Sequence, residues 1–320
     1  MTGVADVTVD DADDAGDALR EAGLPASPAR VPDPETPLDP VPVAPVVPAG
    51  RRARAGRNLP AAVAVGVGLA AVVLLALYVE AVAFVAFACL VVVLALQELA
   101  NALRTVHIQV PLVPVSAGAV AMISTAYGWG AEPLVATLVL TTLAVLLWRL
   151  ARGRGNYLRD ATAGVFAAVY VPFLAALAML LLRAPDGPDR IVVLILLTAC
   201  NDVGGYATGV FLGRHALAPS VSPKKSWEGL GGSLAAAAVG GTLAVPLLLG
   251  GGLLLGAAVG LAVALAATLG DLGESMLKRD LGVKDMGSLL PGHGGIMDRL
   301  DSLLPAAAVL YLLTGVVPAV

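Results

Sequence analysis

The sequence predicts an all-α polytopic membrane protein with about nine transmembrane helices and a polar cavity that faces the cytoplasm. Hydrophobic residues make up 58% of its 320 residues and charged residues only 14%, with a mean hydropathy of +0.85. In soluble domains about a quarter of the residues are charged, so this composition excludes an ordinary soluble protein. The apolar residues also fall into runs of about the 20 residues that a helix needs to cross a bilayer.

The first fifty residues have a different composition from the rest. Ten of the 24 acidic residues lie in the first forty positions, and a proline-rich stretch follows, VPDPETPLDPVPVAPVVPAG. Such a segment cannot bury enough apolar surface to offset its ordering entropy, so 1–50 is predicted to be a disordered acidic tail. Residues 51–320 are predicted to form the membrane domain. Four arginines between positions 51 and 57 precede its first apolar run, which favours a signal-anchor helix over a cleaved signal peptide.

The charges between the apolar runs predict the orientation. Cytoplasmic loops carry the excess of Lys and Arg. With the N-terminus inside, sixteen of these residues lie on the cytoplasmic side and two, Arg183 and Arg190, lie outside. The polar segments described next are therefore expected to face the cytoplasm. The candidate spans are 60–79, 81–99, 110–127, 133–150, 162–182, 190–212, 231–249, 252–270 and 303–320.

Three polar segments interrupt this pattern, and the first contains Asp202 inside a span. An aspartate there costs roughly 2.5 to 3.5 kcal/mol on insertion scales, so it should face a cavity or a partner. A helix-end aspartate, or a structural hydrogen bond inside the bundle, is the alternative. Gly204 and Gly205 would let the helix loosen beside it. The second segment is SPKKSWEG, 222–229, and the third is 271–302.

The third segment carries oxygen ligands at helical spacing. Asp298 and Asp301 stand three residues apart, and Ser302 follows, so their side chains can share one helix face. Hard oxygen donors of this kind suit Mg²⁺ bound together with substrate phosphates, although a solvated helix end with acidic cap residues would look similar. A second polar stripe forms if the preceding helix continues beyond 270, from Asp271, Glu274, Ser275 and Lys278.

Cations and glycines accompany these carboxylates. The basic residues could hold a triphosphate, although any one of them could serve topology alone; they are Lys224, Lys225, Lys278, Arg279, Lys284 and Arg299. The glycines of GHGG, 292–295, permit positive φ or close backbone approach and could cradle an anion. Substrate orientation is favoured for His293, because transfer to an ionised phosphate needs no strong base. No Walker motif occurs, which argues against a P-loop ATPase.

These segments resemble the signature motifs of the phosphatidate cytidylyltransferase family. The match runs over 27 residues, Ser275 to Asp301, through SMLKR, KD, LP, HGGI and DRLD. NDVGGY at 201–206 and SPKKSWEG at 222–229 look like the family's upstream motifs, and the resemblance covers roughly residues 60–320. It implies an enzyme of the bacterial plasma membrane that joins CTP and phosphatidic acid into CDP-diacylglycerol and releases pyrophosphate. It also implies Mg²⁺ with K⁺ beside it and a homodimer, while no nucleic acid is expected as a partner.

The resemblance also assigns roles to residues of this chain. The expected metal ligands are Asp298 and Asp301, supported by Asp202 and Asp271. The expected catalytic group is Asp298, Asp301, Lys278, Arg279 and His293. The expected substrate-binding residues are Ser222, Lys224, Lys225, Ser275, Lys284, Asp285, Gly294, Gly295 and Arg299.

Two other functions remain open at this point. An ion-coupled transporter would also place a carboxylate such as Asp202 inside the membrane, but the outer loops hold few polar residues and a pathway needs them at both ends. A CTP-dependent kinase of polyprenol or phytol type would transfer the γ-phosphate of CTP to a lipid alcohol. The product distinguishes them, because the kinase releases CDP and the cytidylyltransferase releases pyrophosphate.

Overall fold

The computed structural model describes residues 73–153, 155–287, 289 and 294–313, which belong to one compact unit. The predicted tail, 1–50, lies outside them. The described residues are almost wholly helical, and their one departure from an all-α fold is a two-stranded hairpin. The all-α prediction is therefore correct apart from this hairpin.

Among the described residues, seven helices are long and apolar enough to cross a membrane. They match the predicted spans from 81–99 to 252–270 and are α3 (Ala81–Arg104), α4 (Leu112–Trp129), α5 (Ala131–Ala151), the continuous run Tyr157–Leu182, α8 (Gly187–Leu212), α9 (Trp227–Leu249) and α10 (Leu253–Asp280). The predicted spans 60–79 and 303–320 are described only in part, by helical residues 73–79 and by α12 (Leu303–Leu313). The count of nine spans therefore stays a prediction.

The run 157–182 contains a widened turn. It consists of α6 (Tyr157–Ala168), the π-helical turn η1 (Val169–Phe173) and α7 (Leu174–Leu182). Pro172 lies inside this turn. Because proline has no N–H to donate to the carbonyl four residues earlier, the regular α-helical bonding is interrupted there.

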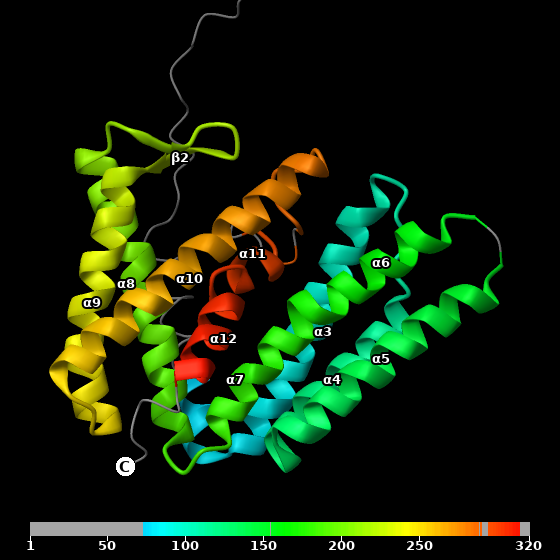
Figure 1. Cartoon of the computed structure of the whole chain (residues 1–320), viewed down its shortest axis with the longest axis horizontal. Helices are drawn as coiled ribbons and strands as arrows, with labels where there is room; N and C mark the ends of the chain where they lie inside the picture. The colour runs from blue at the N-terminus through cyan, green and yellow to red at the C-terminus, as the bar shows by residue number, and fades with distance from the viewer. Residues whose placement is uncertain (1–72, 154, 288, 290–293, 314–320) are drawn as a thin grey trace, which may run out of the picture. The chain divides into compact units, whose positions relative to one another are not determined.

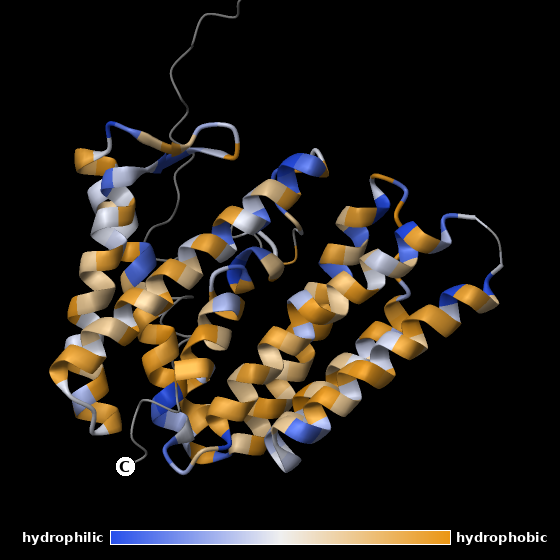
Figure 2. Ribbon diagram, in the orientation of Figure 1, coloured by the Kyte–Doolittle hydropathy of each residue, from blue (hydrophilic) through white to orange (hydrophobic). Residues whose placement is uncertain are grey.

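The helices form two groups joined by α12 (Figure 1). In the first group, α8, α9 and α10 pack side by side, while α3 to α7 make up the second group. Between them, α12 packs against α10 on one side and α7 on the other. Figure 2 shows apolar residues along the middle of the helices and polar residues concentrated where α3, α5 and α10 end. This polar end carries the predicted site segments.

Glycines bring α9 close to both of its neighbours. A Cβ at Gly204 of α8 would collide with the Gly232 carbonyl of α9, and a Cβ at Gly241 of α9 would collide with the Gly256 carbonyl of α10. Small residues at such contacts let helix backbones approach closely, as is common between membrane helices. The spacing of these three helices is therefore set by backbone contact.

The end of α10 reaches beyond the predicted span. The helix has 28 residues, which at 1.5 Å per residue gives about 42 Å, whereas the hydrocarbon core of a bilayer is about 30 Å thick. The condition for the second polar stripe, that this helix continues past residue 270, is therefore met. Its last turns place Asp271, Ser275 and Lys278 next to the site.

The hairpin lies between α8 and α9 and consists of β1 (Ala216–Ala218) and β2 (Ser222–Ser226), paired antiparallel. Ser226 caps α9, because its Oγ accepts a hydrogen bond from the N–H of Gly229 at 3.0 Å. Glu228 holds the other strand by accepting hydrogen bonds from the backbone N–H groups of Arg214 and His215. These contacts fix SPKKS as a strand above the helix group.

Candidate functional site

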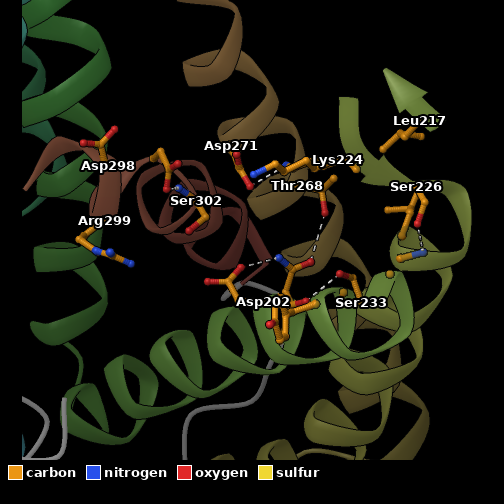
Figure 3. Close-up of a pocket in the computed structure, with 18 residues that line it drawn as sticks. Asp202, Leu217, Lys224, Ser226, Ser233, Thr268, Asp271, Asp298, Arg299 and Ser302 are labelled. Carbon is orange, nitrogen blue, oxygen red and sulfur yellow. Dashed lines mark hydrogen bonds and ion pairs between the residues drawn. The ribbon is translucent and has the colours of Figure 1, made fainter. Parts of the chain in front are cut away.

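All three predicted polar segments line one pocket of about 450 Å³, here called the carboxylate pocket. Figure 3 shows side chains from α8, the hairpin, α9 and α10, and from the segment before α12, around the same space. Its acidic and basic lining residues are Asp202, Lys224, Lys225, Asp271, Asp298, Arg299 and Asp301. The fold thus brings together four carboxylates that are up to about a hundred residues apart in the chain.

A second pocket of about 600 Å³, here called the basic pocket, lies between the hairpin and the end of α10. Its lining contains four cations, Lys224, Lys278, Arg279 and Lys284, and none of its lining residues is acidic. Ser222 and Ser275 add hydroxyl groups. Lys224 lines both pockets, so the two spaces adjoin.

Asp298 is held by donors from three directions. Its carboxylate accepts hydrogen bonds from Lys278 Nζ at 2.9 Å, from the N–H of Gly295 at 2.8 Å and from the N–H of Met286 at 3.2 Å. Burial works to raise the pKa of Asp298, but the hydrogen bond from Lys278 and then those of the two N–H groups outweigh it, and the pKa lies below its usual range. The Asp298 carboxylate is therefore ionised and held in one position.

Asp301 has a contrasting environment. It follows the short helix α11 (Met297–Leu300) and is buried, and its Oδ1 accepts the N–H of Ser302 at 2.6 Å. Burial above all raises the pKa of Asp301, and the negative charge of Asp271 adds to it, although the neighbouring Glu274, the Ser302 N–H and Lys278 act in the opposite direction. Glu274 is itself fully buried, pairs with Lys278 at 2.8 Å and leaves its Oε1 without a hydrogen-bond partner. Asp301 and Glu274 are thus two adjoining carboxyls that are both buried.

Asp202 belongs to a polar network around Asn201. Asn201 Nδ2 donates to Asp202 Oδ1 at 3.0 Å, while Thr268 Oγ1 donates to Asn201 Oδ1 at 3.2 Å. Ser233 Oγ donates to the Asn201 carbonyl at 2.7 Å, which connects α9 to α8. Asp202 thus lines the pocket, as a site residue would, and it also accepts a hydrogen bond inside the helix bundle, as a purely structural aspartate would.

Asp271 faces the hairpin. Its Oδ2 lies 2.6 Å from Lys225 Nζ, and its Oδ1 lies 3.4 Å from Ser275 Oγ. Arg279 reaches the hairpin too, because its Nε donates to the Val221 carbonyl at 3.1 Å. These two contacts hold the hairpin against the end of α10, so that its lysines line the two pockets.

The predicted site residues fall into three groups. Most line one or both pockets: Asp202, Ser222, Lys224, Lys225, Asp271, Ser275, Lys278, Arg279, Lys284, Asp298, Arg299 and Asp301. Asp285 is exposed and lines neither pocket, and neither do Gly294 and Gly295. Gly294 has the expected positive φ, +82°, but the Gly295 N–H is directed at Asp298. His293 lies outside the described residues.

The sequence argument missed Glu98 of α3, which is 3% exposed. Its Oε2 accepts the N–H of Met297 at 2.9 Å, across 199 residues of chain, while its Oε1 has no hydrogen-bond partner among the described residues. A Cβ on either Gly287 or Gly295 would collide with the Glu98 carboxylate. The signal was available, because an isolated acid within an apolar helix is costly wherever it lacks a partner.

The donor set of the carboxylate pocket fits a magnesium ion of the kind that binds with substrate. No group of three or more His, Cys, Asp and Glu side chains that could hold a metal occurs in the described part of the chain. Magnesium bound with phosphates, however, uses only one or two protein carboxylates. Asp298 is ionised and lines this pocket together with Asp202, Asp271 and Asp301, so the carboxylate oxygens that such an ion uses are present.

Comparison with known proteins agrees with this geometry. The sequence profile of the cytidylyltransferase family matches residues 60–317. A Mycobacterium leprae protein named phosphatidate cytidylyltransferase is 38% identical over 281 residues, 83% of this chain and 90% of that protein. A protein of the same name from Mycobacterium tuberculosis strain H37Rv is 36% identical over 284 residues, 85% of this chain and 87% of its own. One from Brucella suis is 41% identical over 172 residues, 53% of this chain and 60% of its own. The resemblance of the motifs is thereby confirmed, and the chain belongs to the cytidylyltransferase family.

Proposed function

We propose that this protein transfers CMP from CTP to phosphatidate, forming CDP-diacylglycerol and pyrophosphate. The observation that supports it best is the adjoining of a carboxylate pocket and a basic pocket through Lys224. A reaction between two polyanions needs charge neutralisation and alignment more than it needs a strong base. A basic pocket next to ionised oxygen ligands supplies both.

The basic pocket suits the triphosphate of CTP. Lys224, Lys278, Arg279 and Lys284 line it, and none of its lining residues is acidic. Lys278 also bonds to Asp298 of the carboxylate pocket at 2.9 Å. A triphosphate held there would therefore place its α-phosphate beside Asp298.

The carboxylate pocket suits the phosphate of the lipid. Tyr206 lines this pocket and is 75% exposed, and next to it on α8 Val203 and Val210 are also exposed. An apolar surface at the edge of a polar pocket would accommodate acyl chains while the phosphate enters. Arg299 and Lys225, which line the same pocket, would neutralise that phosphate.

The chemistry then needs one displacement. A phosphate oxygen of phosphatidate attacks the α-phosphorus of CTP, a new P–O bond forms, and the bond from that phosphorus to the oxygen bridging to the β-phosphorus breaks. The electron pair leaves with pyrophosphate. Because a phosphate monoester is largely ionised near pH 7, no side chain has to remove a proton.

We also propose a magnesium ion at Asp298 and Asp301, with Asp202 and Asp271 in support and potassium beside it. Magnesium would neutralise the charge that develops on the phosphates. In this assignment Asp298 is kept ionised by Lys278 and the N–H groups of Gly295 and Met286, and Ser302 orients the Asp301 carboxyl.

The proposed location is the bacterial plasma membrane, with the polar end of Figure 2 in the cytoplasm. Seven apolar helices and bacterial relatives support a multi-pass membrane protein, and the sixteen-to-two division of basic residues supports the orientation. CTP is a cytosolic nucleotide, so this orientation places both pockets on the side of their substrate. We further propose a homodimer, on the resemblance alone.

The test is a product analysis with the purified full-length protein in detergent. CTP labelled in the cytosine ring, phosphatidate and Mg²⁺ should give one labelled lipid for each pyrophosphate released. Asp298→Asn should lose this transfer, whereas Asp280→Asn, an exposed residue outside both pockets, should keep it.

Other products would refute the proposal. Label that appears in soluble CDP, with phosphate on the lipid, would identify a lipid kinase. CTP that stays intact under all conditions would redirect attention to transport.

A further inference from the structure

A third pocket of about 300 Å³ lies away from the two site pockets and shares no residue with them. It is formed where α3 ends, where α4 begins and where α5 ends, and we call it the arginine pocket. Its lining residues are Arg104, Gln109, Val110, Pro111, Trp148, Arg149 and Arg152. In Figure 1 these helix ends lie at the same end of the molecule as the hairpin and the end of α10.

One of the three arginines is fixed by a buried carboxylate. Arg149 Nε donates to Asp160 Oδ2 at 2.9 Å, and its guanidinium also donates to the Gly155 carbonyl at 2.7 Å. The Asp160 side chain is 2% exposed, and its other oxygen accepts the N–H of Gln109 at 2.9 Å. Asp160 therefore neutralises Arg149 and ties the loop before α4 to α6.

The other two arginines lack a carboxylate partner in the described part of the chain. Arg104 donates only to the amide oxygen of Asn101, at 3.2 Å. The guanidinium of Arg152 lies over the Trp148 ring, 5.2 Å from its centre. Cation–π contact leaves the outward N–H groups of a guanidinium available. The pocket consequently has two uncompensated positive charges and matches a phosphate in charge.

The surface below this pocket is apolar and exposed. Leu140, Leu143, Leu147 and Leu150 follow one another on the outer side of α5 and are 49% to 65% exposed. Only 17% of the α5 span is buried inside the protein, the smallest share among the seven spans. An acyl chain could lie along this side while a phosphate occupies the pocket above it.

We propose that the arginine pocket binds the phosphate headgroup of an anionic membrane phospholipid, separately from the reacting lipid. Basic pockets between membrane helices on the cytoplasmic side are suited to anionic headgroups, and arginine binds phosphate with paired N–H groups. Helix topology alone requires basic residues near helix ends, but it does not require three of them to line one cavity, with one of the three fixed by a buried aspartate. This site does not depend on the reaction proposed above.

The test compares lipids by thermal unfolding of the full-length protein in a zwitterionic detergent. Phosphatidylglycerol should raise the Tm, whereas phosphatidylcholine with the same acyl chains and inorganic phosphate should not. In the double variant Arg104→Gln/Arg152→Gln, the phosphatidylglycerol concentration for half of the effect should rise about tenfold to thirtyfold, at about 1 kcal/mol per basic residue near a lipid surface. Each single variant should raise it about fivefold, which keeps the test valid if the double variant does not fold.

Arg214→Gln is the matched control, since Arg214 is exposed at the same end and lines none of these pockets. Its response should equal that of the unmodified protein. An unchanged response in the Arg104 and Arg152 variants would overturn the proposal. Equal stabilisation by inorganic phosphate would assign the pocket to a soluble anion. A Leu147→Cys variant that cross-links into dimers, with no effect of lipid on Tm, would assign this side of α5 to a second copy of the chain.

Discussion

Replacing Glu98 by alanine should disturb the site from a distance, because this side chain holds the segment that carries Asp298. The substitution removes the carboxylate oxygen that accepts the Met297 N–H at 2.9 Å and leaves that donor buried without a partner. A buried donor stranded in this way costs about 1 to 3 kcal/mol. If the whole cost appears in the activation free energy, through looser placement of the segment that carries Asp298, the rate of CMP transfer falls about fivefold to 160-fold.

Glu98→Gln is the matched variant. Its amide oxygen can still accept the Met297 N–H, and its NH₂ group can replace Oε1, which has no partner in Glu98. We expect this variant to keep most of the activity. The assay measures kcat and KM for CTP together with the Tm of each variant. Unchanged kcat and Tm in Glu98→Ala would refute the reasoning, as would a glutamine variant that is as impaired as the alanine variant.

Three further outcomes are expected. Gly295→Ala should lower both Tm and activity, because its Cβ would meet Glu98 and the Gly287 nitrogen, whereas Gly273→Ala, which has open space around it, should behave normally in both assays. Asp160→Asn should lower the free energy of unfolding by about 3 to 5 kcal/mol, the usual cost of breaking a buried pair, since it leaves Arg149 without its carboxylate; denaturant titration would measure this. Chelation with EDTA should abolish CMP transfer and added Mg²⁺ should restore it, and activity that persists in EDTA would contradict the proposed metal.

The sequence predicted the membrane helices well because their signal is local. Each span is a run of apolar residues, and the break at Glu80 between residues 73–79 and α3 is where the sequence placed it. The helix ends were less accurate: α3 continues to Arg104, beyond the predicted limit of 99. A hydropathy limit marks where the hydrocarbon ends, whereas a helix ends where its backbone bonding stops.

The motifs also identified most of the residues that line the two pockets. Binding of phosphates and a metal ion requires basic and acidic side chains, and the motifs contain these at fixed spacing. The hairpin was missed, since five residues such as SPKKS have no alternation strong enough to predict a strand. Glu98 could have been noticed as an acid within an apolar helix, but its partner could not, because Met297 is 199 residues away and contributes only a backbone N–H. Every residue except proline has a backbone N–H, so the identity of residue 297 does not indicate that it pairs with Glu98.

The glycine contacts of α9 have a consequence for how this enzyme can change. Rotamers of larger side chains can adjust to a substitution, but two backbones in contact cannot. A single added methyl group at Gly241 must push α9 and α10 apart, and one at Gly204 must push α8 and α9 apart. Since these three helices carry Asp202, Ser233 and Asp271, either shift would widen the carboxylate pocket. Variation in substrate preference among related proteins is therefore expected to track the size of the residues at these helix crossings as much as the ionisable groups themselves.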